Sequence, residues 1–583
     1  MKTLEIKQIY LQPPPRLGAG DTISLDLELA GLKEGQLHRP HGTFVSLAGS
    51  FDGETAYLIE DVDQIQEFMD NIQDATWVFH NSVFDIGHLR RWVKIEERKN
   101  MRDTLLIERL MFSGYYSDFG LNDLVRRYLK CHMPKDVRKE FHAHEGRMTQ
   151  EQLEYAAKDV IGTWLVDKEQ QKIIEPHDMK LWNGLYAPHV WTAVNLGGFY
   201  LDQECWKELT AYYQETVDKI STELGQKYGS NVSKMRGRGK ARQEVTEFVP
   251  YNPSSVQQTL AILQSKGIPV EGTDEKTLTH FSDNEFVRDL LEYRKAKKQV
   301  STYGLDFLEF VEADSRIYTS INIGLAETGR DSSSSPNLQN IPSDKARRKC
   351  FTAGQGKVLC LYDYSGQEAN LWAHFSGDER IAEIINSGKK LYLEVARLAF
   401  HEEITKEHPR YKKIKSMVLG LFYGLTPYGL ARNEDMEVEE AEEMFSAFFK
   451  AFPKSEAYVQ KMQSKNNGFV KSVLGRKTWL HPYDRQWKNN ALNAPMQGSG
   501  SDMIKLAMKK LTHLPFFVGN YAKGKVQFIL QVHDELVSEV DLDIAEEWAE
   551  IMKSTMVEVA ESLHPGIRGG VSGGLIQNWS EKD

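Results

Sequence analysis

Apolar and polar residues alternate near the start of the chain, a pattern that predicts a β-strand. In TISLDLELAG (22–31) every second side chain is apolar, which gives the strand one apolar face. Asp26 and Glu28 lie together on the opposite face. A pair of acids on a wet strand face is common, so the pattern alone does not identify a site. Mixed patterns of this kind continue to about residue 175, which predicts an α/β domain.

Two further segments of this domain place acids on predicted helices. WVFHNSVFDIGHLRRW predicts a short strand and then a helix, with Asn81 as the N-cap. Asp85 then falls in the first turn, near the positive end of the helix dipole. EYAAKDV predicts a helix that carries Tyr155 and Asp159 on one face, four residues apart.

The rest of the chain alternates between helical and strand periodicity. Helical patterns dominate from about 176 to 315, and strand patterns return at RIYTSIN (316–322) and KVLCLYDY (357–364). A mostly helical stretch follows over roughly 377–465, and a pair of strands is expected around 525–540. The chain thus predicts a multidomain protein with an α/β domain followed by a larger α+β part.

Composition places the chain among globular proteins. Its 583 residues suit about four domains, and 41% of them are apolar. No apolar run approaches the roughly 18 residues of a membrane span, and the start lacks a signal core, so we expect no membrane partner and a cytoplasmic location. None of the four cysteines is in a CxxC pair, which indicates neither a disulfide framework nor a zinc site.

The charge distribution leaves a nucleic-acid partner open. The net charge is −11, but affinity for nucleic acid depends on local basic surface. KMRGRGKAR (234–242) has five cations and no acid, and basic clusters recur at 294–298, 345–349 and 410–415. Any one cluster is best explained as a solvated face, whereas four of them predict a distributed anion-binding surface.

The acids of the first domain occur in a specific order, as DLE, NSVFD and YAAKD. This order resembles the proofreading 3′–5′ exonucleases of the DnaQ-like superfamily, which have a ribonuclease H-like fold. The resemblance implies that Asp26, Glu28, Asp85 and Asp159 bind two divalent metals and that Tyr155 positions the attacking water. Two unit charges ~4 Å apart repel by about 4 kcal/mol at an effective dielectric constant of ~20, so four acids need cations or protons to converge. Oxygen ligands favour Mg²⁺ or Mn²⁺.

A second set of chemical residues is spread over the larger part of the chain. Asp363 ends an apolar strand, and Asp534 lies in a turn between ILQV and ELVSEV. Between them, Lys415, Leu419 and Tyr423 are spaced by four and share one helical face. A cation beside apolar and aromatic side chains suits a nucleotide, although a lysine that reaches over a core stripe has the same pattern.

These segments resemble motifs A, B and C of the family A DNA polymerases, the group of bacterial DNA polymerase I and many phage replicases. TGRDSSSSPNLQNIP (328–342), LNAPMQGSGSDMIKLAM (492–508) and QVHDELVSEV (531–540) carry the resemblance, which covers nearly the whole chain. It implies a right-hand polymerase after the exonuclease domain (1–175), and no 5′-nuclease domain. We expect the polymerase to span 176–583, with the thumb at about 200–315, the palm at about 316–376 and 470–583, and the fingers at about 377–469.

The resemblance assigns roles to individual residues. Asp363 and Asp534 would hold two Mg²⁺ ions, with Mn²⁺ as a substitute, and Glu535 would support them. Lys415 would grip the triphosphate, while Glu368 and Tyr423 would crowd the sugar 2′ position of a deoxynucleoside triphosphate. The residues expected to contact primer-template DNA are His533, Arg330, Asn337, Gln339, Asn493 and Gln497, together with Arg236, Arg238, Lys240 and Arg242 of the thumb loop.

The chain departs from the family pattern at several of these positions. Motif A reads DYSGQEAN instead of DYSQIELR, with Gly366, Gln367 and Asn370 as the differences. Tyr411 replaces an arginine of motif B, so Arg410, Lys412 or Lys413 is expected to take over its phosphate contact. Asn489, beside Lys488, replaces another arginine. Leu419 stands where the family has Phe or Tyr, and we expect it to favour rejection of dideoxynucleotides.

The predicted function is a template-directed DNA polymerase with proofreading, of the phage replicative type. A gap-filling repair polymerase is the main alternative. A single-subunit RNA polymerase is disfavoured by Glu368 and the exonuclease motifs, and a non-catalytic accessory subunit by the presence of every metal carboxylate. A free exonuclease would not need the remaining ~400 residues. We expect a monomer in a bacterial or phage-infected cell; the sequence identifies no helicase, single-strand binding protein or clamp as a partner.

Overall fold

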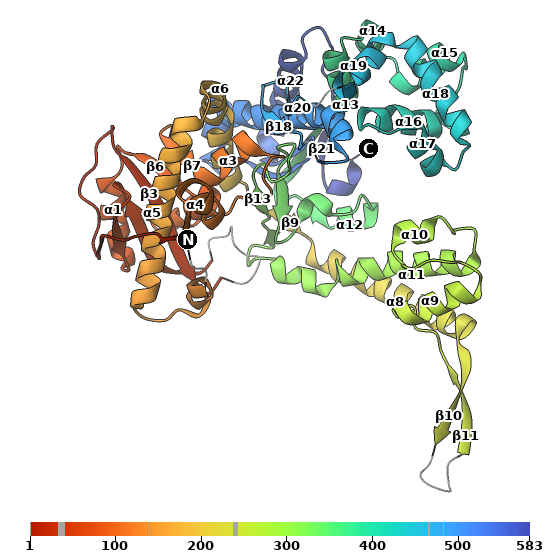
Figure 1. The fold of residues 1–583 in the computed structure, drawn as a ribbon, viewed down its shortest axis with the longest axis horizontal. Helices are drawn as coiled ribbons and strands as arrows, with labels where there is room; N and C mark the ends of the chain where they lie inside the picture. Colours follow the sequence, from red (N-terminus) through yellow and green to blue (C-terminus); the bar gives the residue numbers. More distant parts are fainter. Residues whose placement is uncertain are drawn as a thin grey trace.

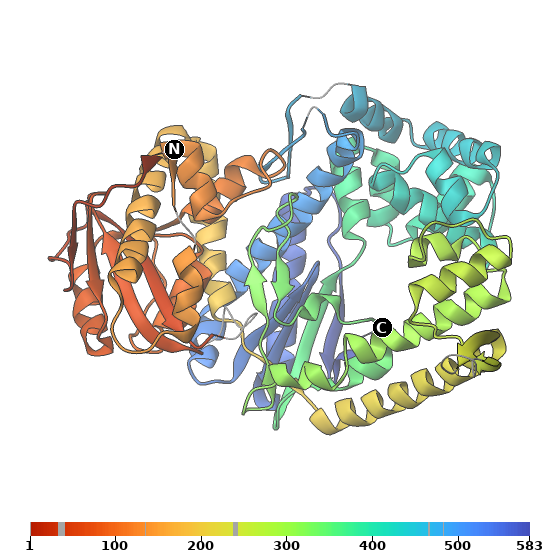
Figure 2. The ribbon, with the colours of Figure 1, turned by 60° about the horizontal axis from the view of Figure 1, so that its bottom comes forward.

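The structure is a computed structural model that describes residues 2–32, 41–133, 136–236, 243–464, 467–481 and 483–582. Figure 1 shows an N-terminal α/β domain beside a larger part built around a central sheet. Figure 2 shows two helical regions, residues 203–301 and 367–464, on the side of this sheet opposite to the N-terminal domain. None of the described helices is long and apolar enough to cross a membrane.

The N-terminal domain contains a six-stranded sheet in the order β2-β5-β4-β3-β6-β7. Its third strand by sequence, β3 (Thr22–Ala30), is the predicted alternating strand and pairs antiparallel with β4 and parallel with β6. The long helix α5 (Gln150–Ile173) packs against β3 and β4. The other strands are β2 (Gln8–Tyr10), β4 (Thr43–Ser50), β5 (Thr55–Ile59), β6 (Thr76–Phe79) and β7 (Met101–Asp103).

The cap of helix α2 (Ser82–Leu89) differs from the prediction. Asn81 occupies the N-cap position in a left-handed conformation, but its side chain makes no capping hydrogen bond. The carboxylate of Asp103 accepts hydrogen bonds from the backbone N–H of Ser82 (2.6 Å) and of Asn81 (3.2 Å) instead. Asp103 also accepts from the N–H of Leu106 and so caps α3 (Thr104–Phe112). A single buried acid satisfies the first turns of two helices.

The region predicted as the thumb is built on two long helices, α8 (Gln203–Tyr228) and α11 (Glu285–Ser301), which pack together. The short helices α9 (Val256–Ser265) and α10 (Glu275–Thr279) complete its own apolar core. The sequence predicted only a basic loop after α8, which was wrong. The strands β10 (Ser230–Arg236) and β11 (Gln243–Val249) form an antiparallel hairpin that projects from the helices (Figure 1).

The central sheet has the order β19-β20-β16-β21. The predicted strands at 357–364 and around 525–540 are confirmed as β16 (Lys357–Tyr364), β19 (Val526–Val532) and β20 (Glu535–Asp541). Helix α22 (Ala545–Leu563) packs on this sheet and on α20 (Trp487–Thr512). The sequence gave no separate signal for β21 (Val571–Ile576), the edge strand beside β16.

The stretch predicted to be helical at 377–465 is confirmed. Its helices share one apolar core with α13, α20 and α22, which fixes them to the central sheet. These helices are α13 (Gln367–Ser376), α14 (Glu379–Asn386), α15 (Leu391–Phe400), α16 (Pro409–Phe422), α17 (Pro427–Glu434), α18 (Val438–Ala451) and α19 (Pro453–Ser464).

Two cysteines that the sequence left unpaired form a disulfide. Cys205 at the start of α8 is bonded to Cys350, and their Cα atoms lie 5.5 Å apart, inside the usual range for a disulfide. The two residues are 145 positions apart in the chain, so no spacing rule could connect them. Cys131 and Cys360 are free thiols.

Candidate active sites

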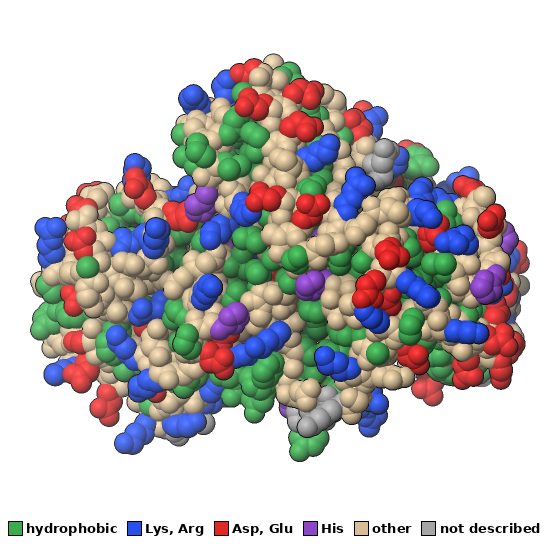
Figure 3. All heavy atoms as spheres, turned by 90° about the horizontal axis from the view of Figure 1, so that it is seen from above, with side chains coloured by type: hydrophobic (Ala, Val, Ile, Leu, Met, Phe, Trp, Pro, Cys, Tyr) green, Lys and Arg blue, Asp and Glu red, His purple; other side chains and the backbone are tan. Residues whose placement is uncertain are grey.

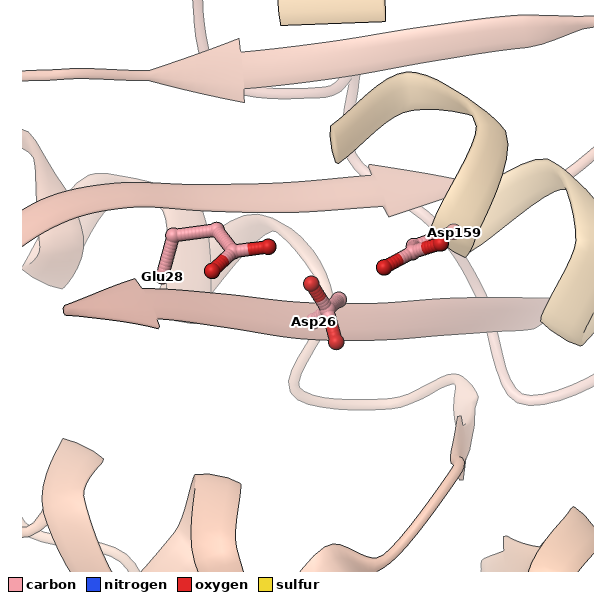
Figure 4. A group of neighbouring side chains, drawn as sticks. All are labelled: Asp26, Glu28 and Asp159. Carbon is pink, nitrogen blue, oxygen red and sulfur yellow. The ribbon is translucent and has the colours of Figure 1, made fainter. Parts of the chain in front are cut away.

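Three of the four acids predicted for the exonuclease site converge. Asp26 and Glu28 project from β3, and Asp159 reaches them from α5, as Figure 4 shows. Each offers a carboxylate oxygen within 4.8 Å of the others. The three side chains are only half-buried, so a solvated cation could reach them. An all-oxygen set of this kind fits a hard divalent cation.

Asp85, the fourth predicted ligand, lies beside this cluster and not within it. Its side chain is buried, and its Oδ1 accepts a hydrogen bond from the backbone N–H of Leu27 over 3.0 Å. Burial and the negative charge of Asp26 raise the pKa of Asp85 well above its usual range. Tyr155 lies one turn before Asp159 on α5, and its ring contacts Phe141 with 5.7 Å between ring centres. A cation beside Asp26 would stabilise the charged form of Asp85.

The central sheet brings the second pair of acids together. Asp363, at the end of β16, pairs in register with Glu535, the first residue of β20. Val532 of β19 also pairs with Glu535, so His533 and Asp534 form the two-residue turn of the hairpin. The backbone N–H of Tyr364 donates to the carbonyl oxygen of Asp534 over 3.2 Å. Asp363 and Asp534 therefore sit at the same end of neighbouring strands.

The charges of this site are incompletely balanced. Burial, together with the negative charges of Glu368 and Asp363, raises the pKa of Asp534 to about 6. The cause is physical: a second carboxylate that loses water beside another one is costly to ionise. A divalent cation would remove this cost, so the residues present fit a metal site.

Three partners of the site escaped the sequence prediction. Ser572 Oγ donates to Asp363 Oδ1 over 2.6 Å, and Trp579 Nε1 donates to Glu535 Oε1 over 3.0 Å. Lys582 Nζ lies 2.8 Å from Asp363 Oδ2 and also forms an ion pair with Glu535. All three belong to GGLIQNWSEKD at the end of the sequence, where only the late G…NW pattern gave a signal.

Helix α16 presents the predicted nucleotide face. Its core side is formed by Ile414, Met417, Val418, Leu421 and Phe422, all buried. Lys415 is exposed, and Leu419 and Tyr423 are half-buried, so they lie on a different face from the core stripe. The alternative of a lysine that merely reaches over the core is therefore wrong for this helix. Tyr423 contacts motif A, because its hydroxyl donates to Glu368 Oε1 over 3.0 Å.

The cations expected to replace the missing motif B arginine are already paired. Arg410 Nη1 lies 2.9 Å from Glu402, and Lys412 Nζ lies 3.6 Å from Glu434. Tyr411 itself makes an edge-on ring contact with Tyr392. A phosphate contact by Arg410 or Lys412 would have to compete with these acids.

The expected DNA-contact residues divide into two groups. Asn337 and Gln339 are used within the protein, since Asn337 Oδ1 accepts from the N–H of Asn340 and Gln339 Nε2 donates to the carbonyl of Gln531. Arg330 lies close enough to His533 and Tyr423 for its charge to act on both. The remaining two, both half-buried on α20, are Asn493 and Gln497.

Only part of the predicted thumb loop can be placed. Arg236, at the end of β10, is exposed and forms an ion pair with Glu247 of β11 over 2.8 Å. Arg238, Lys240 and Arg242 lie outside the described residues. Basic and acidic side chains are interspersed on the face of the molecule seen in Figure 3.

Comparison with known proteins agrees with both sites. Residues 218–581, more than half of the chain, match the family described as DNA polymerase family A. The chain belongs to DNA polymerase family A. Residues 15–175 match the family described as 3′-5′ exonuclease, so an exonuclease domain precedes the polymerase domain.

Named relatives are similar to this family A chain over part of its length. DNA polymerase I of Mycobacterium tuberculosis (strain ATCC 25618 / H37Rv) is 38% identical over 289 residues, which cover 46% of this chain and 31% of the relative. The thermostable DNA polymerase I of Thermus aquaticus is 30% identical over 357 residues, 57% of this chain and 42% of the relative. The chain thus spans less than half the length of these relatives.

One solved structure shows the same fold over almost the whole chain. The POL domain of Pol1 from M. smegmatis, solved in a complex with DNA primer-template and dNTP, superposes with a TM-score of 0.80. The match covers 99% of this chain and 100% of that one, at 24% sequence identity.

The departures in motif A of this family A chain have a structural explanation. Gly366 adopts a φ of +64° just before α13, a conformation that glycine reaches without strain. Gln367 is buried against α20, and a Cβ atom on Gly500 would lie 2.3 Å from its Oε1. The longer polar side chain at 367 is therefore accommodated by a glycine on the opposing helix.

Proposed function

We propose that this protein is a template-directed DNA polymerase with 3′–5′ proofreading exonuclease activity. The observation that carries the proposal is the placement of Asp363 and Asp534 at one end of neighbouring strands, with Glu368 tied to the helix of Lys415 and Tyr423. The mycobacterial neighbour, solved with primer-template DNA and dNTP, supports the same substrates here.

Asp363 and Asp534 would hold two Mg²⁺ ions at the polymerase site, with Glu535 supporting them from the strand. The bound ions would supply Lewis acidity, which favours ionisation of the primer 3′-hydroxyl and neutralises the leaving pyrophosphate. Lys415 binds the triphosphate from α16 and can donate a proton to pyrophosphate. His533 contacts the primer end, and the hydrogen-bonded pair of Glu368 and Tyr423 excludes a 2′-hydroxyl.

The N-terminal site would remove misincorporated residues. Asp26, Glu28 and Asp159 would hold Mg²⁺ or Mn²⁺, with Asp85 beside them, and these ions would stabilise the attacking and leaving oxygens of a phosphodiester. Tyr155 orients the attacking water from the helix of Asp159. Two chemically separate carboxylate sets thus serve strand extension and strand trimming.

We further propose a replicative role of the phage type. The support is that the exonuclease carboxylates converge in the same chain as a polymerase site, which suits copying long templates accurately. A gap-filling repair polymerase would use the same two sites. Product lengths on a primed single-stranded circle and on a short gap, measured under single-binding conditions, separate the two roles: long products from one binding event support replication.

A primer-extension gel with Mg²⁺ tests the biochemical proposal. The wild-type protein should lengthen a primer when nucleotides are present and shorten it when they are absent. Asp534→Asn should only shorten it, and Asp159→Asn should only lengthen it. An unchanged primer in every lane, or loss of both reactions in either variant, would contradict the proposal of two separate sites.

A further inference from the structure

The polymerase carboxylates have a cationic partner in the chain itself. Lys582 Nζ lies 2.8 Å from Asp363 Oδ2 and forms a second ion pair with Glu535. Lys582 occupies position 582 of 583, directly after the short helix η8 (Trp579–Glu581). The ammonium group therefore bridges a predicted metal ligand and its supporting acid.

This bridge is better shielded from solvent than an ordinary surface ion pair. The side chains of Lys582, Asp363 and Glu535 are 24%, 21% and 4% exposed. Charges that have lost most of their water interact more strongly than exposed ones, and breaking such a pair leaves an unbalanced charge. Trp579 Nε1 and Ser572 Oγ hold the other oxygens of the same two acids. Both carboxylates are thereby fixed without a metal ion.

The surroundings give Lys582 room to move. A cavity of about 230 Å³ lies beside it, lined among others by Ser572, Gly573 and Gly574 of β21. Gly573 cannot be filled by a larger residue, since a Cβ atom there would lie 2.1 Å from the carbonyl oxygen of Leu361. A four-carbon side chain on a short terminal segment can leave Asp363 and turn into this space without moving a strand.

We propose that Lys582 is a built-in cation that holds Asp363 and Glu535 in the metal-free protein and gives up Asp363 to a divalent cation. Lys582 then sets the metal concentration at which the polymerase site fills. The inference rests on the proposed function, because it takes Asp363 and Asp534 as metal ligands. It adds a competitor for one of these ligands and thereby a control on metal affinity.

Binding of Mn²⁺, followed by the electron paramagnetic resonance signal of the free ion, tests the inference without using catalysis. The exonuclease site is first silenced with Asp26→Asn and Asp159→Asn, so that the polymerase carboxylates dominate the remaining binding. In this background Lys582→Met should bind Mn²⁺ at least about threefold more tightly, because the competing ammonium is gone while the side-chain volume is kept. Lys582→Arg, which keeps the charge, should bind within about twofold of the background protein.

A matched control is Lys525→Met. Lys525 pairs with Asp543 beyond the far end of β19 from His533, and its removal should leave Mn²⁺ affinity unchanged. Unchanged or weaker Mn²⁺ binding in Lys582→Met, with a folded circular dichroism spectrum, would overturn the inference. The proposed function fails separately: if Asp534→Asn in the same background leaves Mn²⁺ binding intact, the polymerase metal site itself is wrong.

Discussion

The hydroxyl group of Tyr423 donates a hydrogen bond to Oε1 of Glu368 over 3.0 Å and so joins the end of α16 to the first turn of α13. Burial and the negative charge of Glu368 both raise the pKa of Tyr423, which keeps the hydroxyl protonated as a donor at neutral pH. The pair forms a fixed wall at the place where the resemblance puts the sugar of the incoming nucleotide.

Removal of this wall should weaken sugar discrimination. We expect Glu368→Ala to raise ribonucleotide incorporation relative to deoxynucleotide incorporation by about 10- to 100-fold, the effect of about 1.4–2.8 kcal/mol. Single-nucleotide kinetics with matched ribo- and deoxynucleotides measure the ratio. Glu394→Ala, on the exposed surface of α15, is the control and should leave it unchanged. An equal loss for both nucleotides would show that Glu368 acts on binding in general and not on the 2′ position.

Leu419 should govern the response to chain terminators. The side chain is half-buried on the same helix as Lys415 and carries neither ring nor hydroxyl. We expect Leu419→Tyr to raise dideoxynucleotide incorporation relative to deoxynucleotide incorporation by at least tenfold. Leu419→Met keeps the volume without the hydroxyl and should behave as the wild type. Identical ratios in all three proteins would remove Leu419 from the nucleotide site.

Asp331 should be a strong point of stability. Its buried carboxylate lies 2.9 Å from Lys505 Nζ and 2.6 Å from His189 Nε2. Burial alone would raise the pKa of Asp331, but the two partners outweigh it and hold the pKa well below its usual range. Asp331→Asn leaves Lys505 buried without its counter-charge and should cost about 3–5 kcal/mol.

The pH dependence of this loss has a definite sign. A depressed pKa stabilises the fold above the unfolded value of about 3.9, and that stabilisation is lost as the pH falls towards the folded value. The gap between wild type and Asp331→Asn in urea unfolding should therefore be full at pH 7 and shrink below pH 4. Asp543→Asn, in an exposed pair with Lys525, is the control and should cost no more than about 1 kcal/mol. A gap that grows on acidification would contradict the proposed ion pairs.

The hairpin after α8 should bind duplex phosphates. We expect replacement of Arg236, Arg238, Lys240 and Arg242 with alanine to weaken DNA binding for every sequence and to flatten its salt dependence by up to about 0.9 per lost contact. Arg236 is already paired with Glu247, so Arg236→Ala alone should change the slope by less than one contact. Lys7→Ala in the N-terminal domain is the control. An unchanged salt slope in the fourfold variant would remove the hairpin from the interface.

Local periodicity predicted the elements that carry the chemistry. Asp26 and Glu28 share a strand face because side chains alternate along β3, and Asp363 ends β16 as its apolar run predicted. The turn at Asp534 followed from the two flanking apolar runs. These features depend on neighbours within a few residues, so the sequence alone contains enough to place them.

Features that depend on distant partners escaped prediction. Asp103 caps α2 from 21 residues away, and Cys205 meets Cys350 across 145 positions. Lys582 reaches Asp363 only because β21 returns beside β16, an edge pairing with no sequence signature of its own. The hairpin of β10 and β11 has mostly exposed side chains, so it lacks the alternation that marks a half-buried strand.

The two carboxylate sets as metal centres can be tested by anomalous diffraction from crystals soaked in Mn²⁺. We expect one peak beside Asp363 and Asp534 and a second among Asp26, Glu28 and Asp159, both lost when the ion is removed with a chelator. The absence of anomalous density beside Asp363 and Asp534, with their side chains turned apart, would contradict a polymerase site built on these acids.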